Sequence, residues 1–381
     1  MKKVAFIAPT YPVLSETFIQ TEVDSIQSCG HEVCVLTFGK EPSSKNFNYD
    51  IVEIGSDVSL TQLLSISPTG VYKALDFVTS QQSMPKKSLF VYGLKLAMQL
   101  SELKVNHVHA HFGQHTAAHA IVAAKLLNIS CSFVAHGHDV YESPFDIEKK
   151  IQASDFVVAV CKTMQDDFNN IASGDIKLLH CGVKTDLFVP EAKLGSDTLK
   201  LVFLGRLVYQ KGVQDLINAL IPIADELNIS LDIIGKGELE QMLKRQVVQA
   251  RLMSRVRFLG SKPHSWVKKN LSQYDCLVAP FCYSDSGCVD TGPLVLKEAM
   301  AVGTPVITTN IMGCKEIVSS DTGYLVNEKS VSELTESITR FAKLSLEQRK
   351  QMGEQARARV VEHFDARRQA MQLSNWIENT V

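Results

Sequence analysis

The stretch LKLVFLGRLVYQKGVQDLINAL, residues 199 to 220, runs from a short apolar segment through a basic turn into an amphipathic helical pattern. The apolar segment ends at LVFLG, Arg206 follows it directly, and Lys211 with Gly212 opens the helical pattern. A strand, a turn and a helix in this order form one unit of a parallel sheet, in which ligands bind at the carboxyl ends of the strands. The stretch therefore predicts both a fold class and the place where a ligand would bind.

Short apolar runs alternate with helical patterns along all 381 residues, which is typical of parallel α/β sheets. In the first half the strand candidates are KVAFIAP, HEVCVLTF, DIVEIG, NHVHAHF, CSFVAHG, DFVVAV and IKLLHCG. In the second half they are LKLVFLGR, LDIIG, VRFLG, YDCLVAP, TPVITT and TGYLV. Polar residues 183 to 198 lie between the two series and predict a linker. At about 150 residues per domain, the sequence predicts an α/β protein of two doubly wound domains that face a central cleft.

The composition is that of an ordinary globular protein, with 45% hydrophobic and 21% charged residues. The net charge is -2, and arginine and lysine are spread along the chain rather than gathered in one block. Neither feature indicates a nucleic-acid partner. The 9 cysteines include no CxxC pair, so we expect reduced thiols rather than a disulfide framework or a structural zinc site. No apolar run is long enough to span a bilayer, and the N-terminal one is too short for a signal peptide, so we expect a cytoplasmic protein.

The stretch DTGPLVLKEAM, residues 290 to 300, predicts a second helix start that could hold a ligand. Pro293 suits the first helical position, and the free N–H groups of Leu294 and Val295 would then form a site for an anion. Helical side chains tilt toward the N-terminus, so Glu298 reaches back beside that site. Because a carboxylate repels a phosphate, we expect Glu298 to accept hydrogen bonds from neutral hydroxyls beside it, such as those of a ribose.

Arg206 and Lys211 lie on either side of the strand-to-helix turn in GRLVYQKG. Two fixed cations near a helix N-terminus suit a diphosphate that gains negative charge as it leaves. The alternative is that both are solvated surface residues. Because Lys211 follows a turn and precedes a helix, we expect its side chain to project from the surface of the cleft rather than into a core. The sequence IIGKGELE, after another strand, predicts a tight turn at Gly235 and Gly237 near a bound nucleotide.

Histidines cluster in HVHAHFGQHTAAH, residues 107 to 119. Strand alternation puts the first three on one side, and His115 lies one helical turn before His119. The helical pair lacks the glutamate of a zinc-protease helix, so we expect hydrogen-bonded histidines rather than a metal site. His136 differs because it ends the strand SFVA at the edge where ligands bind, with a structural role as its alternative.

Residues 84 to 104, MPKKSLFVYGLKLAMQLSELK, form an amphipathic helical pattern in which lysines accompany an apolar side. A basic amphipathic helix can lie on an anionic membrane, which would make the protein peripheral on the inner face. An ordinary domain helix with a solvated face is the more common explanation of the same pattern. The sequence leaves both alternatives open.

Several segments resemble the retaining glycosyltransferases of family 4, which share the GT-B fold of two Rossmann-like domains. FLGRLVYQKGVQDLINAL is similar to the phosphate-binding strand, loop and helix of that family. DTGPLVLKEAMAVGTPVI resembles its signature, in which two glutamates are separated by seven residues. GHEVCVLTF and HVHAHFG resemble segments of its N-terminal domain. YPVLSETFIQTEV is most similar to bacterial members that build exopolysaccharides and lipopolysaccharides.

The resemblance implies a role for each residue of the predicted anion site. Arg206 and Lys211 would bind the donor diphosphate. Leu294 and Val295 would offer backbone N–H groups to a phosphate. Glu298 would hold the ribose hydroxyls, in agreement with the repulsion between a carboxylate and a phosphate.

The resemblance also implies contacts to the donor sugar. His136 would contact the sugar near the reacting centre, and Asp290 stands where the family has the first glutamate of its signature, which usually touches sugar hydroxyls. Aspartate is one methylene shorter than glutamate, so we expect its contact with the sugar hydroxyls to differ. The usual Gly-Gly of the first loop is replaced by PTYPVLSE, residues 9 to 16. The family is metal-independent, so the resemblance implies no metal ligands, and it requires no cofactor besides the nucleotide-sugar substrate.

The expected domains are an acceptor-side domain at residues 1–185, to which a C-terminal helix at 364–381 returns, and a nucleotide-sugar donor domain at residues 186–363. The expected reaction is retaining transfer of a hexosyl group from a UDP-sugar, with GDP-mannose as the second choice. The expected acceptor is a saccharide or lipid-linked saccharide of a cell-surface polysaccharide. A sugar-nucleotide epimerase of the same fold and a non-catalytic nucleotide-binding module are the alternatives.

Overall fold

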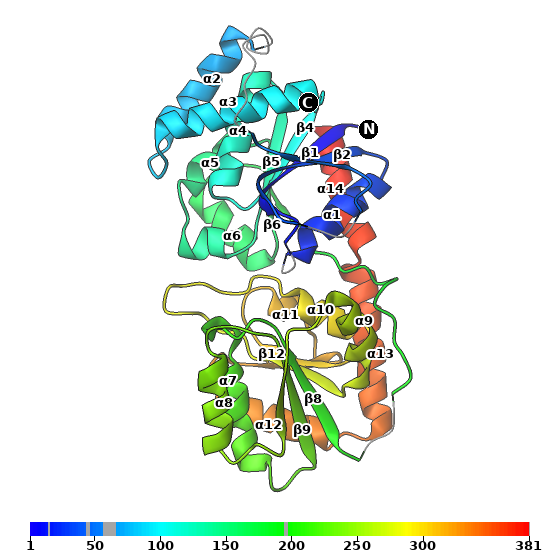
Figure 1. The fold of residues 1–381 in the computed structure, drawn as a ribbon. Helices are drawn as coiled ribbons and strands as arrows, with labels where there is room; N and C mark the ends of the chain where they lie inside the picture. Colours follow the sequence, from blue (N-terminus) through cyan, green and yellow to red (C-terminus); the bar gives the residue numbers. More distant parts are fainter. Residues whose placement is uncertain (14–15, 43–45, 56–65, 194–196, 381) are drawn as a thin grey trace. The chain divides into compact units, whose positions relative to one another are not determined.

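The computed structural model of the chain forms two compact units (Figure 1). The first consists of Met1–Gly182 with Ala366–Val381, and the second of Val183–Asp365. The residues that the structure describes are 1–13, 16–42, 46–55, 66–193 and 197–380. Residues 14 and 15 of the predicted first loop, and 194 to 196 of the predicted linker, therefore lie outside the described residues.

The first unit is built on a parallel sheet of 7 strands in the order β3-β2-β1-β4-β5-β6-β7. The strands are β1 (Lys3–Tyr11), β2 (Glu32–Lys40), β3 (Asp50–Glu53), β4 (His107–His111), β5 (Ser130–Ala135), β6 (Phe156–Ala159) and β7 (Ile176–Leu178). The strand order reverses between β1 and β4, because the chain adds β2 and β3 on one side before it adds β4 on the other. Ligands of doubly wound sheets bind outside the carboxyl ends of the strands at such a reversal.

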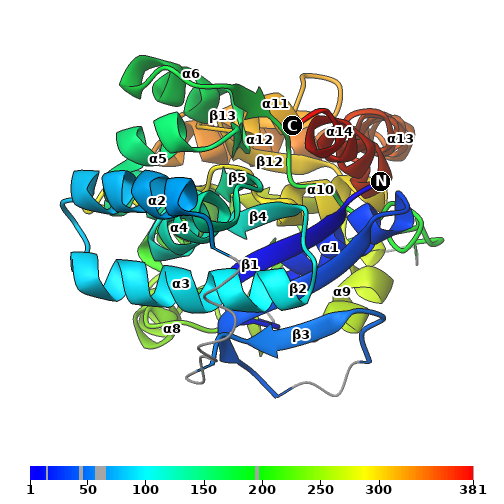
Figure 2. The same ribbon diagram turned by 90° about the horizontal axis from the view of Figure 1, so that it is seen from above.

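Helices cover both faces of the first sheet. They are α1 (Thr17–Ser28), α2 (Pro68–Ser80), α3 (Lys86–Glu102), α4 (His115–Leu127), α5 (Ile147–Ala153), α6 (Lys162–Ile171) and α14 (Ala366–Asn379), with a π-helical turn at His138–Glu142. Figure 2 shows α2, α3 and α4 together on one side of β1 and β4, with α1 on the other. The start of α2 follows from its sequence, since Pro68 takes the first helical position and the Ser67 hydroxyl accepts a hydrogen bond from the Gly70 N–H at 3.0 Å.

Helix α3 contains the amphipathic pattern for which the sequence leaves two explanations. Its apolar residues Leu89, Leu96 and Leu100 are fully buried, and a Cβ on Gly93 would collide with Val122 of α4. The apolar side of α3 is thus committed to the core of the unit, which favours an ordinary domain helix over membrane binding by residues 84 to 104. No helix among the described residues is both long and apolar enough to cross a membrane.

The second unit repeats the architecture with a parallel sheet of 6 strands in the order β10-β9-β8-β11-β12-β13. The strands are β8 (Leu199–Leu204), β9 (Ile229–Ile234), β10 (Val256–Gly260), β11 (Cys276–Ala279), β12 (Val306–Thr309) and β13 (Gly323–Val326). Here the order reverses between β8 and β11. Every strand candidate of both halves corresponds to a strand of the structure, so the predicted fold of two doubly wound α/β domains is confirmed.

Helices also cover both faces of the second sheet. They are α7 (Val213–Leu220), α8 (Glu240–Gln249), α9 (His264–Asn270), α10 (Leu294–Ala301), α11 (Cys314–Ile317), α12 (Val331–Ala342) and α13 (Leu346–His363). In Figure 1, α7 and α8 lie on one face, and α9, α10 and α13 lie on the other. The core against α7 is formed by apolar side chains that alternate along β8, Leu201 and Phe203, and by Leu216 and Ile217 of the helix itself. These contacts hold the loop that follows β8 at the edge of the sheet.

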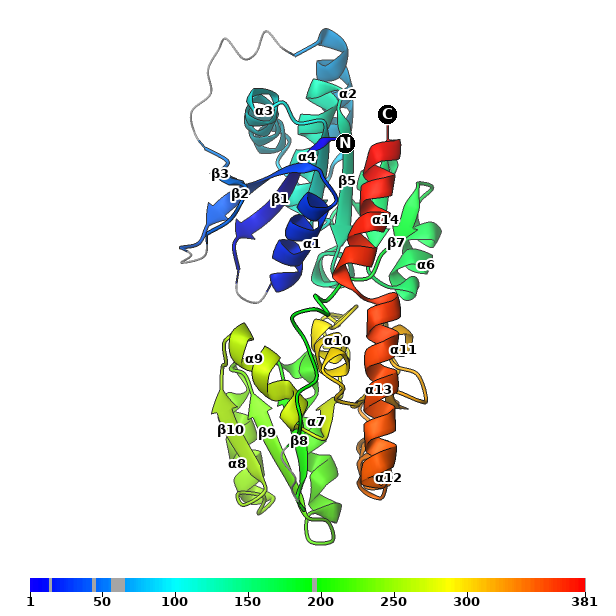
Figure 3. The ribbon, with the colours of Figure 1, turned by 90° about the vertical axis from the view of Figure 1, so that its right-hand side faces the viewer.

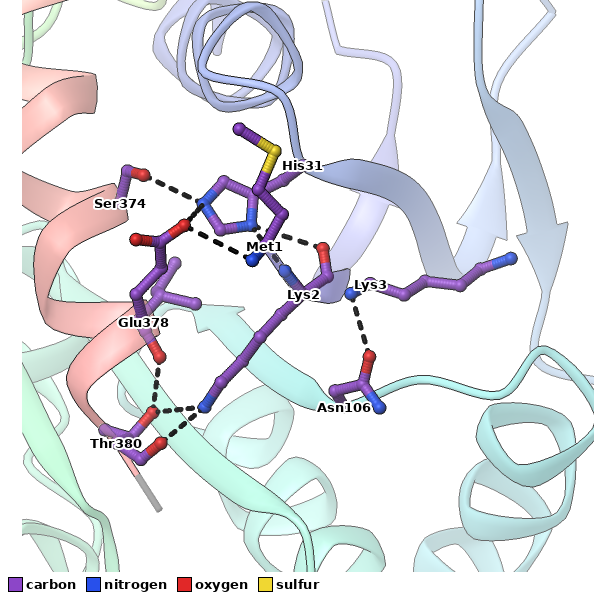
Figure 4. Close-up of polar contacts among 9 residues, drawn as sticks. Met1, Lys2, Lys3, His31, Asn106, Ser374, Glu378 and Thr380 are labelled. Atoms are coloured by element: carbon purple, nitrogen blue, oxygen red, sulfur yellow. Dashed lines mark hydrogen bonds and ion pairs between the residues drawn. The ribbon is translucent and has the colours of Figure 1, made fainter.

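The last helix, α14, belongs to the first unit, where it packs against α1 (Figure 3). Figure 4 shows its polar contacts with the start of the chain: the His31 Nε2 lies 2.8 Å from the Ser374 hydroxyl, and the Lys2 ammonium donates to the Thr380 carbonyl at 2.6 Å. The chain therefore leaves the first unit after Gly182 and re-enters it at Ala366. The sequence places these two divisions a few residues away, after residues 185 and 363.

Candidate active site

The loop after β8 is held in place by the loop after β9. The Leu207 N–H donates to the Lys236 carbonyl at 2.9 Å, and the Leu239 N–H donates to the Leu207 carbonyl at 3.0 Å. A Cβ on Gly237 would collide with the backbone of Leu207, so only glycine permits this approach. Gly237 therefore supports the loop that presents Arg206, and this packing explains its glycine without a direct ligand contact.

Lys211 is fixed between the loops that follow β8 and β11. It ends a 3-10 turn, Tyr209–Lys211, and Gly212, with φ of 69°, precedes the first residue of α7. A Cβ on Gly212 would collide with the Pro280 carbonyl, so the two loops pack backbone against backbone. Lys211 thus precedes α7 rather than opening it, and it lies where the strand order of the second sheet reverses.

The Lys211 ammonium forms an ion pair with Asp290. Its Nζ lies 2.8 Å from Asp290 Oδ1 and 2.7 Å from Oδ2, and 5.0 Å from the centre of the Phe281 ring. The side chain of Lys211 is only 13% exposed and that of Asp290 is 24% exposed. Lys211 is therefore more enclosed than the sequence suggests, because the carboxylate of Asp290, from a distant part of the chain, pairs with it.

Arg206 differs from Lys211 in its surroundings. It follows Gly205 at the end of β8, and its side chain is exposed. Across the part of the chain that the structure describes, no hydrogen bond or ion pair engages the Arg206 guanidinium. An exposed guanidinium with five donors can meet an incoming phosphate without first breaking a bond to the protein.

Helix α10 begins one residue later than the sequence predicts. Pro293 has φ of -61° and ψ of 120°, an extended conformation that makes it the N-cap residue, and Leu294 is the first helical residue. The Leu294 and Val295 N–H groups still belong to the first turn, where helical N–H groups have no partner within the helix. They lie on the segment that follows β11, beyond Asp290 in the chain.

Glu298 lies within α10 and is largely buried, with 8% of the residue exposed. One of its oxygens, Oε1, lies 3.1 Å from Nε2 of His264, the first residue of α9. The carboxylate is thereby held by one imidazole from a neighbouring helix. Among the described residues His264 is its one polar partner, so the carboxylate can accept further hydrogen bonds.

In the first unit His136 follows β5 directly and is part of a buried cluster of histidines. Its Nε2 lies 3.1 Å from Nδ1 of His111, and the Phe18 ring packs against it with 4.3 Å between ring centres. Burial lowers the pKa of His136 well below its ordinary value, and the neighbouring His111 lowers it further. The imidazole of His136 is therefore neutral at neutral pH.

The three histidines of β4 point to one side of the strand, as the alternation predicts, and all are fully buried. His107 and His109 share the Ser132 hydroxyl at 2.7 Å each. His109 and His111 each direct Nε2 at Oε1 of Glu22, at 3.3 and 3.4 Å. These three residues offer ligand atoms within 4.8 Å of one another, so the same group has the composition of a divalent cation site.

The helical pair at the start of α4 has a different environment. His119 is buried, its Nδ1 lies 2.7 Å from the His115 carbonyl oxygen, and its ring packs against Phe38. Burial lowers the pKa of His119 to about 4. The two rings lie 6.4 Å apart in an edge-on arrangement, with His119 in the core of the unit and His115 exposed.

Comparison with known sequences identifies the class of protein. Residues 15–187 match the model of the Glycosyltransferase Family 4 domain, and residues 186–359 match that of the Glycosyl transferases group 1 domain. The chain belongs to these glycosyltransferases. Together the two matches cover nearly the whole of this glycosyltransferase. In the sequence, the boundary between them lies within a few residues of the division between the two units.

Individual relatives of this glycosyltransferase match it over most of their length. The amylovoran biosynthesis glycosyltransferase AmsK of Erwinia amylovora is 23% identical over 89% of this chain and 90% of its own. The N-acetyl-alpha-D-glucosaminyl L-malate synthase of Bacillus anthracis is 26% identical over 72% of this chain and 75% of its own. Among solved structures, Alr3699/HepE of Anabaena in complex with UDP and glucose has a TM-score of 0.75 at 14% identity and is covered completely by this chain.

Two residues of the glycosyltransferase's candidate sites are absent from the sequence-based prediction, Glu22 and His264. Glu22 lies in the amphipathic pattern of α1, where a glutamate ordinarily faces solvent. His264 follows Pro263 in a short helix with no apolar periodicity. Neither position carries a local signal, because both become site residues only through partners that lie far away in the chain.

Proposed function

We propose that this glycosyltransferase transfers a hexosyl group from a nucleoside diphosphate sugar to a saccharide or lipid-linked saccharide acceptor, with retention of the anomeric configuration and without a metal. A UDP-sugar is the first choice of donor, and GDP-mannose is the second. The observation that carries the proposal is the presence of two cations, Arg206 and Lys211, on the loop after β8, beside the reversal of strand order. The UDP bound in the HepE structure supports a nucleoside diphosphate donor. The name of AmsK, an amylovoran biosynthesis glycosyltransferase, supports a role in cell-surface polysaccharide synthesis.

The second unit would hold the nucleotide diphosphate. Arg206 and Lys211 neutralise the diphosphate, and the N–H groups of Leu294 and Val295 add the positive potential of the α10 N-terminus. The carboxylate of Glu298 accepts hydrogen bonds from the ribose hydroxyls rather than meeting a phosphate. As the sugar departs, the diphosphate gains negative charge, and the two cations stabilise that charge in the transition state.

The sugar would be held by Asp290 and His136. Asp290 accepts hydrogen bonds from sugar hydroxyls while one of its oxygens keeps the pair with Lys211. His136 contributes a neutral imidazole near the reacting centre. We expect front-side substitution, in which a phosphate oxygen of the departing donor takes the proton of the acceptor hydroxyl, so no protein nucleophile is required. We expect the reaction to take place in the cytoplasm, with no resident cofactor.

A transfer assay separates this proposal from its alternatives. The protein is incubated with UDP- and GDP-sugars and a pool of lipid-linked saccharides, with EDTA present throughout. Sugar transfer that depends on the acceptor and gives the retained anomer supports the proposal. Conversion of the donor sugar without an acceptor would identify an epimerase, and the absence of turnover with every pair would identify a binding module.

A thermal-shift comparison of UDP, GDP and ADP addresses the base. We expect UDP to raise the melting temperature most. Stabilisation by GDP in preference to UDP would move GDP-mannose to first place, and stabilisation by ADP alone would contradict both donors.

A further inference from the structure

Three buried polar atoms of the first unit converge on one point. Oε1 of Glu22, on α1, lies 3.3 Å from His109 Nε2 and 3.4 Å from His111 Nε2, both on β4. The two histidines are fully buried, and all three atoms are out of reach of solvent. None of the three atoms has a hydrogen-bond partner among the described residues, and their approaches to one another are not hydrogen bonds either. Buried polar groups without partners are rare in folded proteins, so three of them at one point need a physical explanation.

The spacing of the three atoms is that of ligands around one metal ion. Zinc binds imidazole nitrogens and carboxylate oxygens at about 2.0–2.2 Å, and tetrahedral ligands at such distances lie about 3.3–3.6 Å from one another. The two N–O separations, 3.3 and 3.4 Å, fall in this range, and all three ligand atoms lie within 4.8 Å of one another. A hydrogen bond from a ring nitrogen to a carboxylate is usually shorter, at about 2.7–2.9 Å.

The other nitrogen of each ring already has a partner, as is usual for metal-binding histidines. A histidine that binds a metal through Nε2 donates the proton of Nδ1 to a second group, which fixes the orientation of the ring. His109 Nδ1 lies 2.7 Å from the hydroxyl of Ser132, a fully buried residue of the neighbouring strand β5. His111 Nδ1 lies 3.1 Å from His136 Nε2. Both rings are thus held with Nε2 toward Glu22 by contacts in which Glu22 takes no part.

A small cavity beside Glu22 has room for one further ligand. It lies between α1, the segment after β7 and α14, and its walls include Phe18, Thr21, Glu22 and Leu373. Its volume of about 20 Å³ accommodates a single water molecule, whereas pockets for small organic ligands have roughly 300–1,000 Å³. A water molecule can therefore complete the coordination, but the cavity is too small to bring a sugar to the same point.

We propose that Glu22, His109 and His111 bind a divalent transition-metal ion, zinc in the first instance. Magnesium and calcium prefer sites made of oxygen atoms alone, whereas two imidazoles and a carboxylate suit zinc. The charge of the ion also compensates a carboxylate oxygen that lies out of reach of water and is costly to bury unpaired. With one water molecule as the fourth ligand, every unpartnered atom of the cluster is satisfied.

The ion is structural and takes no part in sugar transfer. It joins α1 to the end of β4, where His111 contacts His136. The proposal rests on contacts within the first unit and does not depend on the proposed function. A protein that binds zinc at these residues but transfers no sugar would contradict the proposed function alone. An active transferase that binds no zinc would contradict the metal site alone.

Zinc binding by the full chain is the first test. Protein without an affinity tag is stripped with a chelator, reconstituted with zinc sulfate, desalted, and measured by elemental analysis and X-ray absorption. We expect one zinc ion per chain, bound by two imidazoles and by oxygen at about 2.0–2.2 Å, and a higher melting temperature than that of the stripped protein. A chain that retains no zinc, or that binds it through sulfur, would overturn the proposal.

Substitutions test whether the zinc lies at these residues. Ser132→Ala removes only the partner of His109 and should weaken zinc binding by about 10–100-fold, and Glu22→Gln, which removes the charge of a ligand, should weaken it further. His119→Gln is the matched control, because His119 is also buried in the first unit but lies outside the cluster, and it should bind zinc as the wild type does. Equal zinc affinity in Glu22→Gln and the wild type would overturn the proposal. If Glu22→Gln does not fold, the affinity of Ser132→Ala decides in the same way.

Discussion

The two units place different chemistry at the same position of the same architecture. In the first, the edge where the strand order reverses carries histidines that are mostly buried and the Glu22 carboxylate beside them. In the second, that edge carries charged side chains on loops, of which Arg206 is exposed and Lys211 is held by a carboxylate. Burial favours the neutral form of an imidazole, whereas partly exposed charges remain available to an anion. The first arrangement suits the orientation of a neutral sugar, and the second suits the binding of a diphosphate.

The largest effect that we expect comes from Lys211→Ala. Hydrogen bonds to charged groups contribute about 1.5–3 kcal/mol, so loss of the ammonium from the leaving diphosphate should slow turnover by roughly tenfold to a hundredfold. The transfer rate at saturating donor and acceptor measures this effect. Lys350→Ala, at an exposed lysine of α13 that pairs with Glu354, is the matched control and should keep full activity.

Lys211→Ala should also affect stability, because it leaves Asp290 partly buried without its partner. We expect a loss of about 1–2 kcal/mol, less than for a fully buried pair because both side chains retain some exposure. The double variant with Asp290→Asn should recover part of that loss, since no unpaired carboxylate remains. Normal activity in the single variant would show that the diphosphate binds elsewhere and would remove the contrast between the two units.

The next effect is a loss of stability of the first unit at acid pH. Burial lowers the pKa of His119 to about 4 from an ordinary value of 6.5, and burial also lowers the pKa values of His107, His109 and His136. Below about pH 6.5 these histidines bind protons in the unfolded chain but not in the folded unit. Their contribution to the stability of the first unit is therefore complete above that pH and is lost as the pH falls toward 4. At pH 5 His119 alone should cost the first unit about 2 kcal/mol.

Hydrogen exchange followed by mass spectrometry at pH 7.5 and pH 5, corrected for intrinsic rates, measures this loss unit by unit. The second unit should lose less, because its histidines, His264 and His363, both contact solvent. The variant His119→Leu should weaken the pH dependence of the first unit. Equal losses in the two units would mean that burial of histidines is not what separates them.

A smaller effect is expected for Glu298→Gln. If its carboxylate accepts hydrogen bonds from the ribose hydroxyls, loss of the charge should weaken UDP binding by about tenfold, measured by titration calorimetry. A 2′,3′-dideoxy analogue of UDP should bind the variant and the wild type alike, because it lacks the hydroxyls. Glu354→Gln, on the exposed side of α13, is the control. If the variant binds UDP as tightly as the wild type does, Glu298 only holds His264.

The smallest effect is expected for the stability of Arg206→Ala. The exposed guanidinium has no partner among the described residues, so its removal should change the free energy of unfolding by less than about 0.5 kcal/mol. Thermal melting measures this value, and the transfer assay should show slower turnover in the same sample. A clear loss of stability would indicate that Arg206, like the buried histidines, holds the fold together.

The fold could be read from the sequence because each strand is a local pattern. Short apolar runs bounded by polar turns predict all strands of both sheets, and the alternation along β4 predicts that its histidines share a side. The start of α10 was misplaced by one residue because the φ of proline suits both the N-cap and the first helical position, and only ψ separates them. The sequence leaves two explanations for α3, because a helix on a membrane surface and an ordinary domain helix share the same apolar periodicity.

The site could be predicted only in part because its pairs join distant segments. Lys211 and Asp290 are 79 residues apart, and His264 and Glu298 are 34 residues apart. The chemical type of each residue is visible in the sequence. Which side chains pair with one another depends on how the loops pack, and the sequence does not show this packing. The burial of Lys211 and the contact of Glu22 with two histidines follow from that packing, so no local pattern contains them.

The return of α14 to the first unit has a consequence for the order in which the chain can fold during synthesis. The second unit lies between Gly182 and Ala366 in the sequence, and these two residues pack against each other, since a Cβ on Gly182 would lie 2.5 Å from the Ala366 Cα. A ribosome therefore releases all of Val183–Asp365 before the helix that covers α1 has emerged, and the unit that is made second can be completed first. For the same reason a stop codon after Gly182 would leave His31 without Ser374. Deletion of residues 183 to 365 with a short splice between Gly182 and Ala366 should instead yield the first unit as one continuous chain.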